Sequence, residues 1–116
     1  VRKACERDSF VVRTFTELER RQAGDKISRF AGSFAVKEAV AKALGTGFRA
    51  FMPIDIEVAR DELGKPYVNL YRGARALAHE LGVERIEVSI SNTAEHAMAF
   101  AVAEGAPRAG EKEVGG

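Results

Sequence analysis

The second half of the chain alternates between apolar and polar residues, and this pattern predicts β-strands. In residues 54–60, Ile54, Ile56 and Val58 point to one side, as in a half-buried strand. The predicted strands are IDIEVAR (54–60), YVNLY (67–71), RIEVSIS (85–91) and AMAFAVAE (97–104). Turn-forming residues at 61–66 and 92–96 join them into two hairpins.

The remaining segments are typical of helices. Residues 1–13 are expected to be partly helical, and Thr16 with Glu19 fits a capping box at the start of a short helix that Gly24 ends. SFAVKEAVAKAL is rich in helix-forming residues and predicts a long central helix over about 26–44, stopped by GTG (45–47). GARALAHELG (73–82) predicts a last helix, closed by Gly82.

Helices followed by two hairpins with a helix between them predict an α+β fold, with a small antiparallel sheet packed on helices. We expect a single domain over 1–104, because no internal repeat or linker interrupts it. The Gly-rich, charged segment 105–116 is expected to be a flexible C-terminal tail.

The last predicted strand has one face made only of alanine, at positions 97, 99, 101 and 103. Such a face lets another layer approach closely. It suits either a covering helix, which is the ordinary α+β arrangement, or a neighbouring subunit.

Composition narrows the function classes. The chain has 116 residues, a formal net charge of +1 and 46% hydrophobic residues, which indicates a globular domain and argues against a strongly basic nucleic-acid binder. Cys5 is the only cysteine, so neither an intrachain disulfide nor a Cys-rich zinc site is expected. No apolar run could span a bilayer and no signal sequence is evident, so we expect a cytoplasmic protein. The chain begins with Val1 rather than Met, which is consistent with a natural start upstream.

The candidate chemistry lies on the central helix. Glu38 and Lys42 are four residues apart and share a helical face, with Lys37 beside it. A carboxylate that binds magnesium and an ammonium that binds phosphate could together move a phosphoryl group. On spacing alone, an exposed ion pair worth about 0.3–0.5 kcal/mol is the more common explanation.

Other polar groups have ordinary alternatives. GTG (45–47) could bind phosphate, but a helix cap is the more common explanation. LGKPY (63–67) could contact a ligand through its backbone, but a hairpin turn explains it fully, and SISNT (89–93) could hold phosphates or sugars but is also normal turn composition. His79 and His96 have no partner at metal-ligand spacing, and Cys5 has no evident base. The arginines at 13, 20 and 21 are either solvated surface or a docking site for an acidic protein.

Taken together, FAVKEAVAKALGTG, IDIEV, LGKPYV and VSISNTAEHAMAFAVAE resemble the holo-[acyl-carrier-protein] synthases, the small phosphopantetheinyl transferases. The match runs in order from about Phe10 to Glu104. The resemblance implies transfer of the 4′-phosphopantetheine arm of coenzyme A to an acyl-carrier-protein serine, with magnesium and release of 3′,5′-ADP. It further implies a role in fatty acid biosynthesis, within lipid metabolism, and a homotrimer with sites between subunits, for which the alanine face could serve.

The resemblance also assigns roles to residues. Glu38 would be catalytic and ligate magnesium, and Lys42 would be catalytic and hold the pyrophosphate. Arg13 would meet the carrier protein. Contacts to coenzyme A would come from Lys37, Lys42, Gly45, Gly64, Lys65, Pro66, Ser91, Asn92 and Thr93. The general base stays open between a metal-polarised water and Glu38 itself.

Three departures from the family pattern motivate a second hypothesis. No Gly-x-Asp strand, which carries the family's second metal-ligating carboxylate, precedes Val1 in the sequence given. Ser33 replaces an arginine and Asn92 a histidine, which would weaken phosphate contacts. The alternative is therefore a weak or inactive relative that binds coenzyme A or the carrier protein. A nucleic-acid binder is a third possibility, which the near-neutral charge disfavours.

Overall fold

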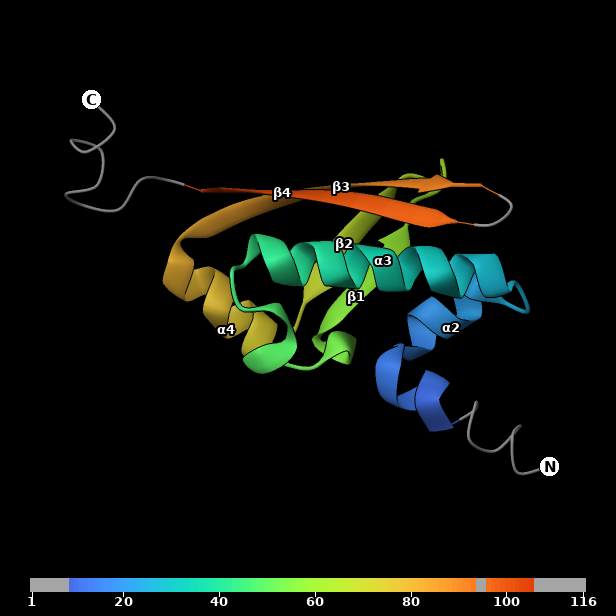
Figure 1. Ribbon diagram of the computed structural model, residues 1–116, viewed down its shortest axis with the longest axis horizontal. Coiled ribbons are helices and arrows are strands. Elements are labelled where there is room, and N and C mark those ends of the chain that lie inside the picture. Colours follow the sequence, from blue (N-terminus) through green and yellow to red (C-terminus); the bar gives the residue numbers. More distant parts are fainter. Residues whose placement is uncertain (1–8, 94–95, 106–116) are drawn as a thin grey trace.

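The computed structural model describes residues 9–93 and 96–105 and has the α+β architecture that the sequence predicts (Figure 1). Residues 9–14 are helical. The elements that follow are α2 (Glu17–Ala23), α3 (Ile27–Ala43), the 3₁₀ turns η1 (Gly47–Arg49) and η2 (Pro53–Asp55), β1 (Ile56–Arg60), β2 (Pro66–Leu70), α4 (Arg72–Leu81), β3 (Val83–Asn92) and β4 (Ala97–Gly105). Gly105 ends β4, and the rest of the predicted tail, like Cys5, lies outside the described residues.

The capping box at the start of α2 is confirmed. The Glu19 amide donates to the Thr16 hydroxyl, and the Thr16 amide donates to the Glu19 carboxylate. Gly24 ends the helix at φ 60°, a backbone conformation that favours glycine. These local interactions set where α2 begins and ends before any tertiary contact is considered.

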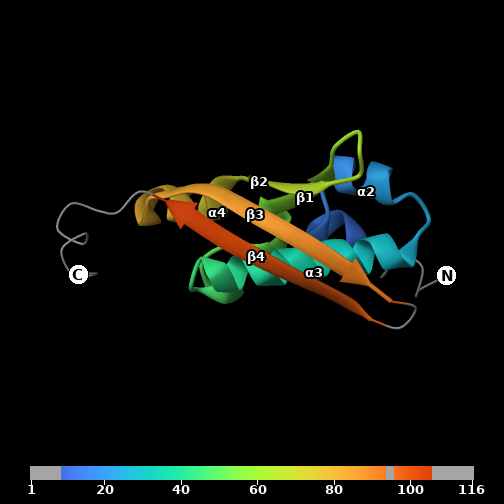
Figure 2. The same ribbon diagram turned by 90° about the horizontal axis from the view of Figure 1, so that it is seen from above.

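The antiparallel strands form two separate hairpins, and α3 lies between them. β1 pairs with β2 and β3 with β4, with Val58 opposite Val68 and Ser89 opposite Phe100. Figures 1 and 2 show the long β3–β4 hairpin crossing one side of α3, while β1 and β2 lie on another. One helix therefore supplies the core contacts of both hairpins.

The alanine face of β4 packs against α3. Ala99 and Ala101 lie against the core cluster, whereas Met98, Phe100 and Val102 on the opposite face are 58%, 64% and 55% exposed. The covering-helix interpretation is thus confirmed, and the idea that the alanine face serves a subunit contact is wrong. Because α3 already covers that face, a subunit contact made by β4 would have to use the opposite face.

β1 differs from the half-buried strand that its alternation predicts. Pro53–Asp55 forms a 3₁₀ turn, so the strand starts at Ile56, and Glu57 and Ala59 are buried as fully as Val58. Hydrogen bonds to Glu57 make this possible, since a polar side chain can enter the core when its oxygens are satisfied. The hydrophobic pattern alone cannot reveal such partners.

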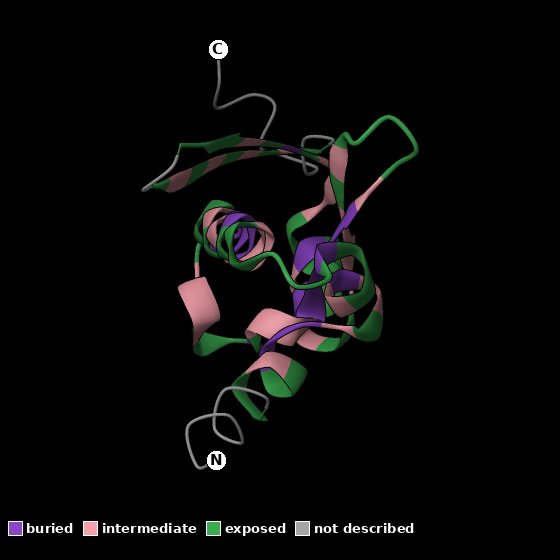
Figure 3. Cartoon of the chain, turned by 90° about the vertical axis from the view of Figure 1, so that its right-hand side faces the viewer, coloured by how far each residue is buried: buried purple, intermediate pink, exposed green. Residues whose placement is uncertain are grey.

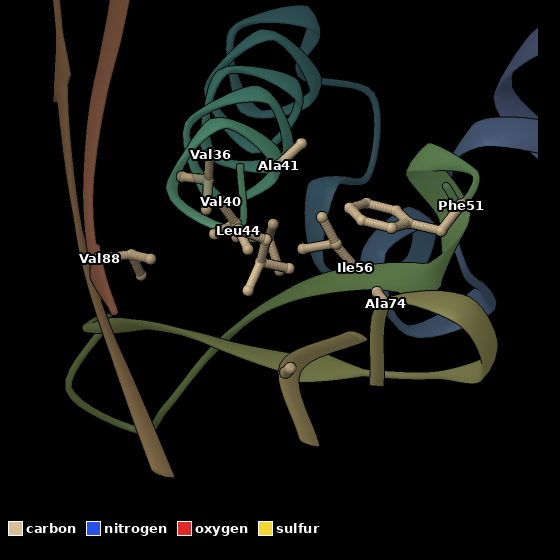
Figure 4. Close-up of a cluster of buried hydrophobic side chains, with 10 residues drawn as sticks. Val36, Val40, Ala41, Leu44, Phe51, Ile56, Ala74 and Val88 are labelled. Atoms are coloured by element: carbon tan, nitrogen blue, oxygen red, sulfur yellow. The ribbon is translucent and has the colours of Figure 1, made fainter. Parts of the chain in front are cut away.

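The core gathers between α3, β1, α4 and β3. Val36, Val40, Leu44 and Ile56 meet there, and Val88 reaches in from β3 (Figure 4). Viewed along α3, the buried residues of the helix lie on the side toward β1, and no helix or strand of the described residues covers the opposite side (Figure 3). No helix among the described residues is long and apolar enough to cross a membrane.

Substituting Val40 tests this core. Val40 is fully buried, so Val40→Ala should lower the free energy of unfolding by about 2 kcal/mol through lost apolar contact and a residual cavity. Chemical denaturation measures the effect. Val12→Ala, at a 52% exposed position, is the matched control and should change stability by less than about 0.5 kcal/mol. Equal effects would contradict the proposed core.

Candidate active site

Glu38 and Lys42 lie on the uncovered side of α3, and both are exposed. They stand opposite the buried positions Val36 and Val40, as the 100° spacing of residues round a helix requires. Ala31 and Ala35 precede them at one-turn spacing on the same side. Glu38, the predicted magnesium ligand, and Lys42, the predicted pyrophosphate contact, therefore face outward together. The side chains of Ala31 and Ala35 beside them have little bulk.

The two side chains do not form the ion pair that spacing alone suggests. Within residues 9–93 and 96–105, no salt bridge or hydrogen bond joins the side chains of Glu38 and Lys42 or ties either side chain to another residue. A carboxylate and an ammonium are thus both free to meet a ligand on one surface.

The structure contradicts the expectation that Lys37 contacts coenzyme A. Its side chain is fully buried, and its ammonium donates to Glu19 and to the backbone oxygens of Pro53 and Ile56. An ammonium has three donors, so none is left for a phosphate. Lys37 follows Val36 round the helix into the core, which places it on the face away from Lys42.

Burial and the neighbouring carboxylate act on the pKa of Lys37 in opposite directions. Burial lowers the pKa of Lys37 below its ordinary value, and the nearby Glu19 carboxylate opposes that shift. The Phe15 ring adds a cation–π contact, with its centroid 5.2 Å from Nζ. All buried side-chain nitrogen and oxygen atoms of the described residues have a partner, so this polar cluster is complete.

Glu57 is a second buried carboxylate in the same region. Thr16 and Tyr71 donate from their hydroxyls, at 2.6 and 3.1 Å, and Asn69 donates from its amide at 3.0 Å. Burial would raise the pKa of Glu57, but these hydrogen bonds and the charge of Lys37 outweigh burial and lower it. Glu57 is therefore held ionised, although nothing in its alternating strand pattern indicates this.

The Gly64-Lys65-Pro66 turn joins β1 to β2. Asp61 accepts hydrogen bonds from the amides of Leu63 and Lys65, and Gly64 adopts φ 84°. The turn is thus held by its own backbone contacts, while Gly64 and Lys65 stay exposed. Gly45, at φ 90°, is likewise exposed just after α3.

Ser91, Asn92 and Thr93 are exposed at the end of β3. A Cβ built on Gly32 of α3 would lie 3.4 Å from the Asn92 side-chain oxygen, so Asn92 sits directly over the N-terminal half of this helix. Asn92 and Thr93 line one hollow with Ile27, Ser28, Ala31, His96 and Ala97. The sequence pattern does not connect His96 or Ser28 with this hollow, because only the packing of β3 on α3 brings them together.

Ser33, where the family pattern has arginine, lies beside two other arginines. It lines a small hollow with Arg29 and Arg60. Burial, and then the charge of Arg29, lower the pKa of Arg60. Two arginines therefore lie around the same hollow as Ser33, one from α3 and one from β1.

A single chain divides the predicted ligand contacts between two surfaces. The uncovered side of α3, which carries Glu38 and Lys42, and the β1–β2 turn lie on opposite sides of the molecule (Figure 3). Arg13 is exposed on the N-terminal helix, where its Nε donates to the Ser9 carbonyl at 3.2 Å. His79 is exposed on α4.

The residues present suit magnesium only in combination with a substrate. No cluster of three His, Cys, Asp or Glu side chains able to hold a metal occurs in the described part of the chain. Magnesium, however, is commonly bound through one or two carboxylates together with substrate phosphates. The exposed, unpaired Glu38 beside Lys42 fits that mode, with a pyrophosphate supplying the other oxygens.

Comparison with known proteins gives a consistent picture. Residues 1–101 match the model of the 4′-phosphopantetheinyl transferase superfamily. The chain is 55% identical over 102 residues to a holo-[acyl-carrier-protein] synthase of Lachnoclostridium phytofermentans, covering 88% of this chain and 84% of that protein. It is 45% identical over 102 residues to a protein of the same name from Caldanaerobacter subterraneus, covering 85% and 80%.

The fold agrees with a solved structure as well. The crystal structure of Helicobacter pylori holo-[acyl-carrier-protein] synthase in complex with coenzyme A superposes with a TM-score of 0.76 at 28% identity, covering 90% of each chain.

The buried Glu57 should make stability sensitive to acid. Its lowered pKa means that the unfolded chain takes up a proton first, so stability is full above about pH 4.5 and falls as the pH drops through the folded-state value. Unfolding free energies between about pH 6 and pH 3 should fall less steeply for Glu57→Gln than for the parent protein. Glu84→Gln, at an exposed site, should keep the parent's slope; an unchanged slope for Glu57→Gln would contradict the prediction.

Proposed function

We infer that this chain, which belongs to the 4′-phosphopantetheinyl transferase superfamily, transfers the 4′-phosphopantetheine arm of coenzyme A to a serine of an acyl carrier protein. The serine hydroxyl attacks the β-phosphate, the bond to the 3′,5′-ADP portion breaks, and 3′,5′-ADP leaves. One observation carries the assignment of the site: Glu38 and Lys42 stand together, exposed and unpaired, on the uncovered side of α3.

In this proposal Glu38 is the protein ligand of magnesium. A bound magnesium ion would neutralise and orient the pyrophosphate oxygens. The Glu38 carboxylate has no other partner in the described residues, so binding a cation breaks no existing contact. Because phosphoryl-type transfer depends on in-line positioning and charge neutralisation, one well-placed carboxylate can have a large effect.

Lys42 binds the same pyrophosphate from one helical turn further along. Its ammonium offsets negative charge that grows on the leaving group, and it can donate a proton there. Gly45, the Gly64-Lys65-Pro66 turn and the segment Ser91–Thr93 complete the proposed coenzyme A contacts. Lys37 is left out, because its three donors are already used.

The contacts on the two sides of the molecule imply that subunits share each site. The β1–β2 turn and the uncovered side of α3 face apart in one chain, so one coenzyme A would meet both only if the turn came from a neighbour. Met98, Phe100 and Val102 form an exposed apolar strip on β4, a surface typical of subunit contacts. We therefore propose a homotrimer built on this face rather than on the alanine face.

The exposed Arg13 is the proposed contact to the carrier protein. Its positive charge would complement an acidic surface on that partner. A cytoplasmic location and a role in fatty acid biosynthesis belong to the same proposal, and the absence of a membrane-spanning helix among the described residues agrees with the location.

Glu38→Gln tests the site. Removing the negative charge should lower kcat by on the order of 100-fold in a magnesium-dependent assay of carrier-protein modification. A neutral amide binds magnesium more weakly than a carboxylate does, so the charge of the pyrophosphate would be neutralised less well. Glu84→Gln, which is exposed on β3, is the control and should keep normal turnover.

Normal turnover by Glu38→Gln would contradict the site assignment. A parent protein that binds coenzyme A in calorimetry, yet never modifies a carrier protein with magnesium supplied, would favour the binding-module alternative.

Phe100→Gln tests the assembly. Placing an amide in the middle of the apolar strip should shift the mass measured by sedimentation from trimer toward monomer, because apolar burial at the interface is lost. Met52→Gln, at a 60% exposed apolar residue outside this strip, should leave the mass unchanged. A parent protein that sediments as a monomer would refute the shared-site arrangement.

A further inference from the structure

Lys37, the residue before Glu38 on α3, forms a buried contact with Glu19 on the core side of the helix. Lys37 Nζ is 2.8 Å from Glu19 Oε1, and the side chains of the two residues are 0% and 1% exposed. The same ammonium donates to the carbonyls of Pro53, at 3.1 Å, and Ile56. The next residue along α3 is Glu38.

Glu19 is held as firmly as Lys37. Its Oε1 also accepts the Thr16 amide, and its Oε2 accepts the Val58 amide at 2.9 Å. The pair therefore joins α2, α3, the η2 turn and β1 through directional bonds. Through these bonds the central helix α3 is tied both to α2 and to β1 of the first hairpin.

Stability alone does not require charges at these positions. Taking an ammonium and a carboxylate out of water is costly, and well-packed apolar residues often stabilise a core as well or better. Apolar contacts around Val36 and Val40 already hold α3 against the core. What the pair adds is direction, because hydrogen bonds limit sliding and rotation more narrowly than apolar packing does.

We propose that the Lys37–Glu19 pair is a positioning device that sets the rotation and axial placement of α3, and through them the placement of Glu38 and Lys42. Lys37, anchored inward by three acceptors, fixes the rotation of α3, and at that rotation Glu38, 100° further round the helix, is exposed. Phosphoryl transfer is sensitive to displacements of about 1 Å, so a small shift of α3 would lower turnover without unfolding the chain. The inference rests on the proposed roles of Glu38 and Lys42.

A double substitution separates positioning from stability. Lys37→Met alone leaves Glu19 charged and unpaired, so the thermal midpoint should fall by on the order of 10 °C. Adding Glu19→Gln removes that charge and should recover most of the loss. If the pair positions α3, the double variant should still show kcat lowered at least about tenfold and a raised half-saturating magnesium concentration, with KM for coenzyme A nearly unchanged.

Hydrogen exchange gives a readout that does not depend on activity. Amides in residues 36–42 should exchange faster in the double variant than in the parent, at conditions matched for global stability. The matched control is Glu17→Gln with Arg21→Met, which removes an exposed i,i+4 pair from α2 and should change neither exchange nor kcat.

Glu19→Asp guards against a double variant that fails to fold. It keeps both charges but withdraws the carboxylate by one methylene from its buried partners, so kcat should fall and the half-saturating magnesium concentration should rise, while the thermal midpoint should fall by less than in Lys37→Met, which leaves a charge without a partner. Parent-like kcat and exchange in a stable double variant, or parent-like kcat in Glu19→Asp, would overturn the positioning role. A fully active Glu38→Gln would instead overturn the site itself, so the two failures are distinguishable.

Discussion

The central physical constraint in this protein is a charged side chain inside its core. Lys37 lies in the middle of the longest helix, and its burial is possible only because Glu19 and two backbone carbonyls surround its ammonium. Meeting that requirement brings α2, α3, the η2 turn and β1 to one point. The rotation of α3 that places Lys37 in the core also leaves Glu38 and Lys42 exposed, since each residue points about 100° away from the one before it.

The rest of the fold leaves one side of α3 open. The β3–β4 hairpin covers a second side of the helix with small alanine residues, and β1 with α4 closes the core. Two surfaces result that a monomer does not use: the uncovered side of α3 and the apolar strip of β4. The proposed shared site would account for both surfaces, because a neighbouring subunit on the strip could bring its own β1–β2 turn to the open side of a partner's α3.

Much of the architecture was predictable because its signals are local. The capping box at Thr16, the stops at Gly24 and Gly82 and the alternation in β3 and β4 each depend on residues close in sequence, and each appears as expected. β1 was predicted less well, because Glu57 is buried by partners in two other segments: Thr16, and Asn69 with Tyr71. The composition of a strand does not show which distant donors will reach it.

The sequence by itself determined the elements, the family resemblance and the presence of Glu38 and Lys42 on one helical face, because helical spacing and capping act over a few residues. Only the tertiary structure decided which lysine faces the ligand. Lys37 and Lys42 are chemically identical in the sequence, yet packing against β1 encloses the first and leaves the second exposed. Packing likewise placed Arg60 of β1 beside Ser33 of α3 and turned the alanine face of β4 inward, since burial is a property of elements in contact and not of any one segment.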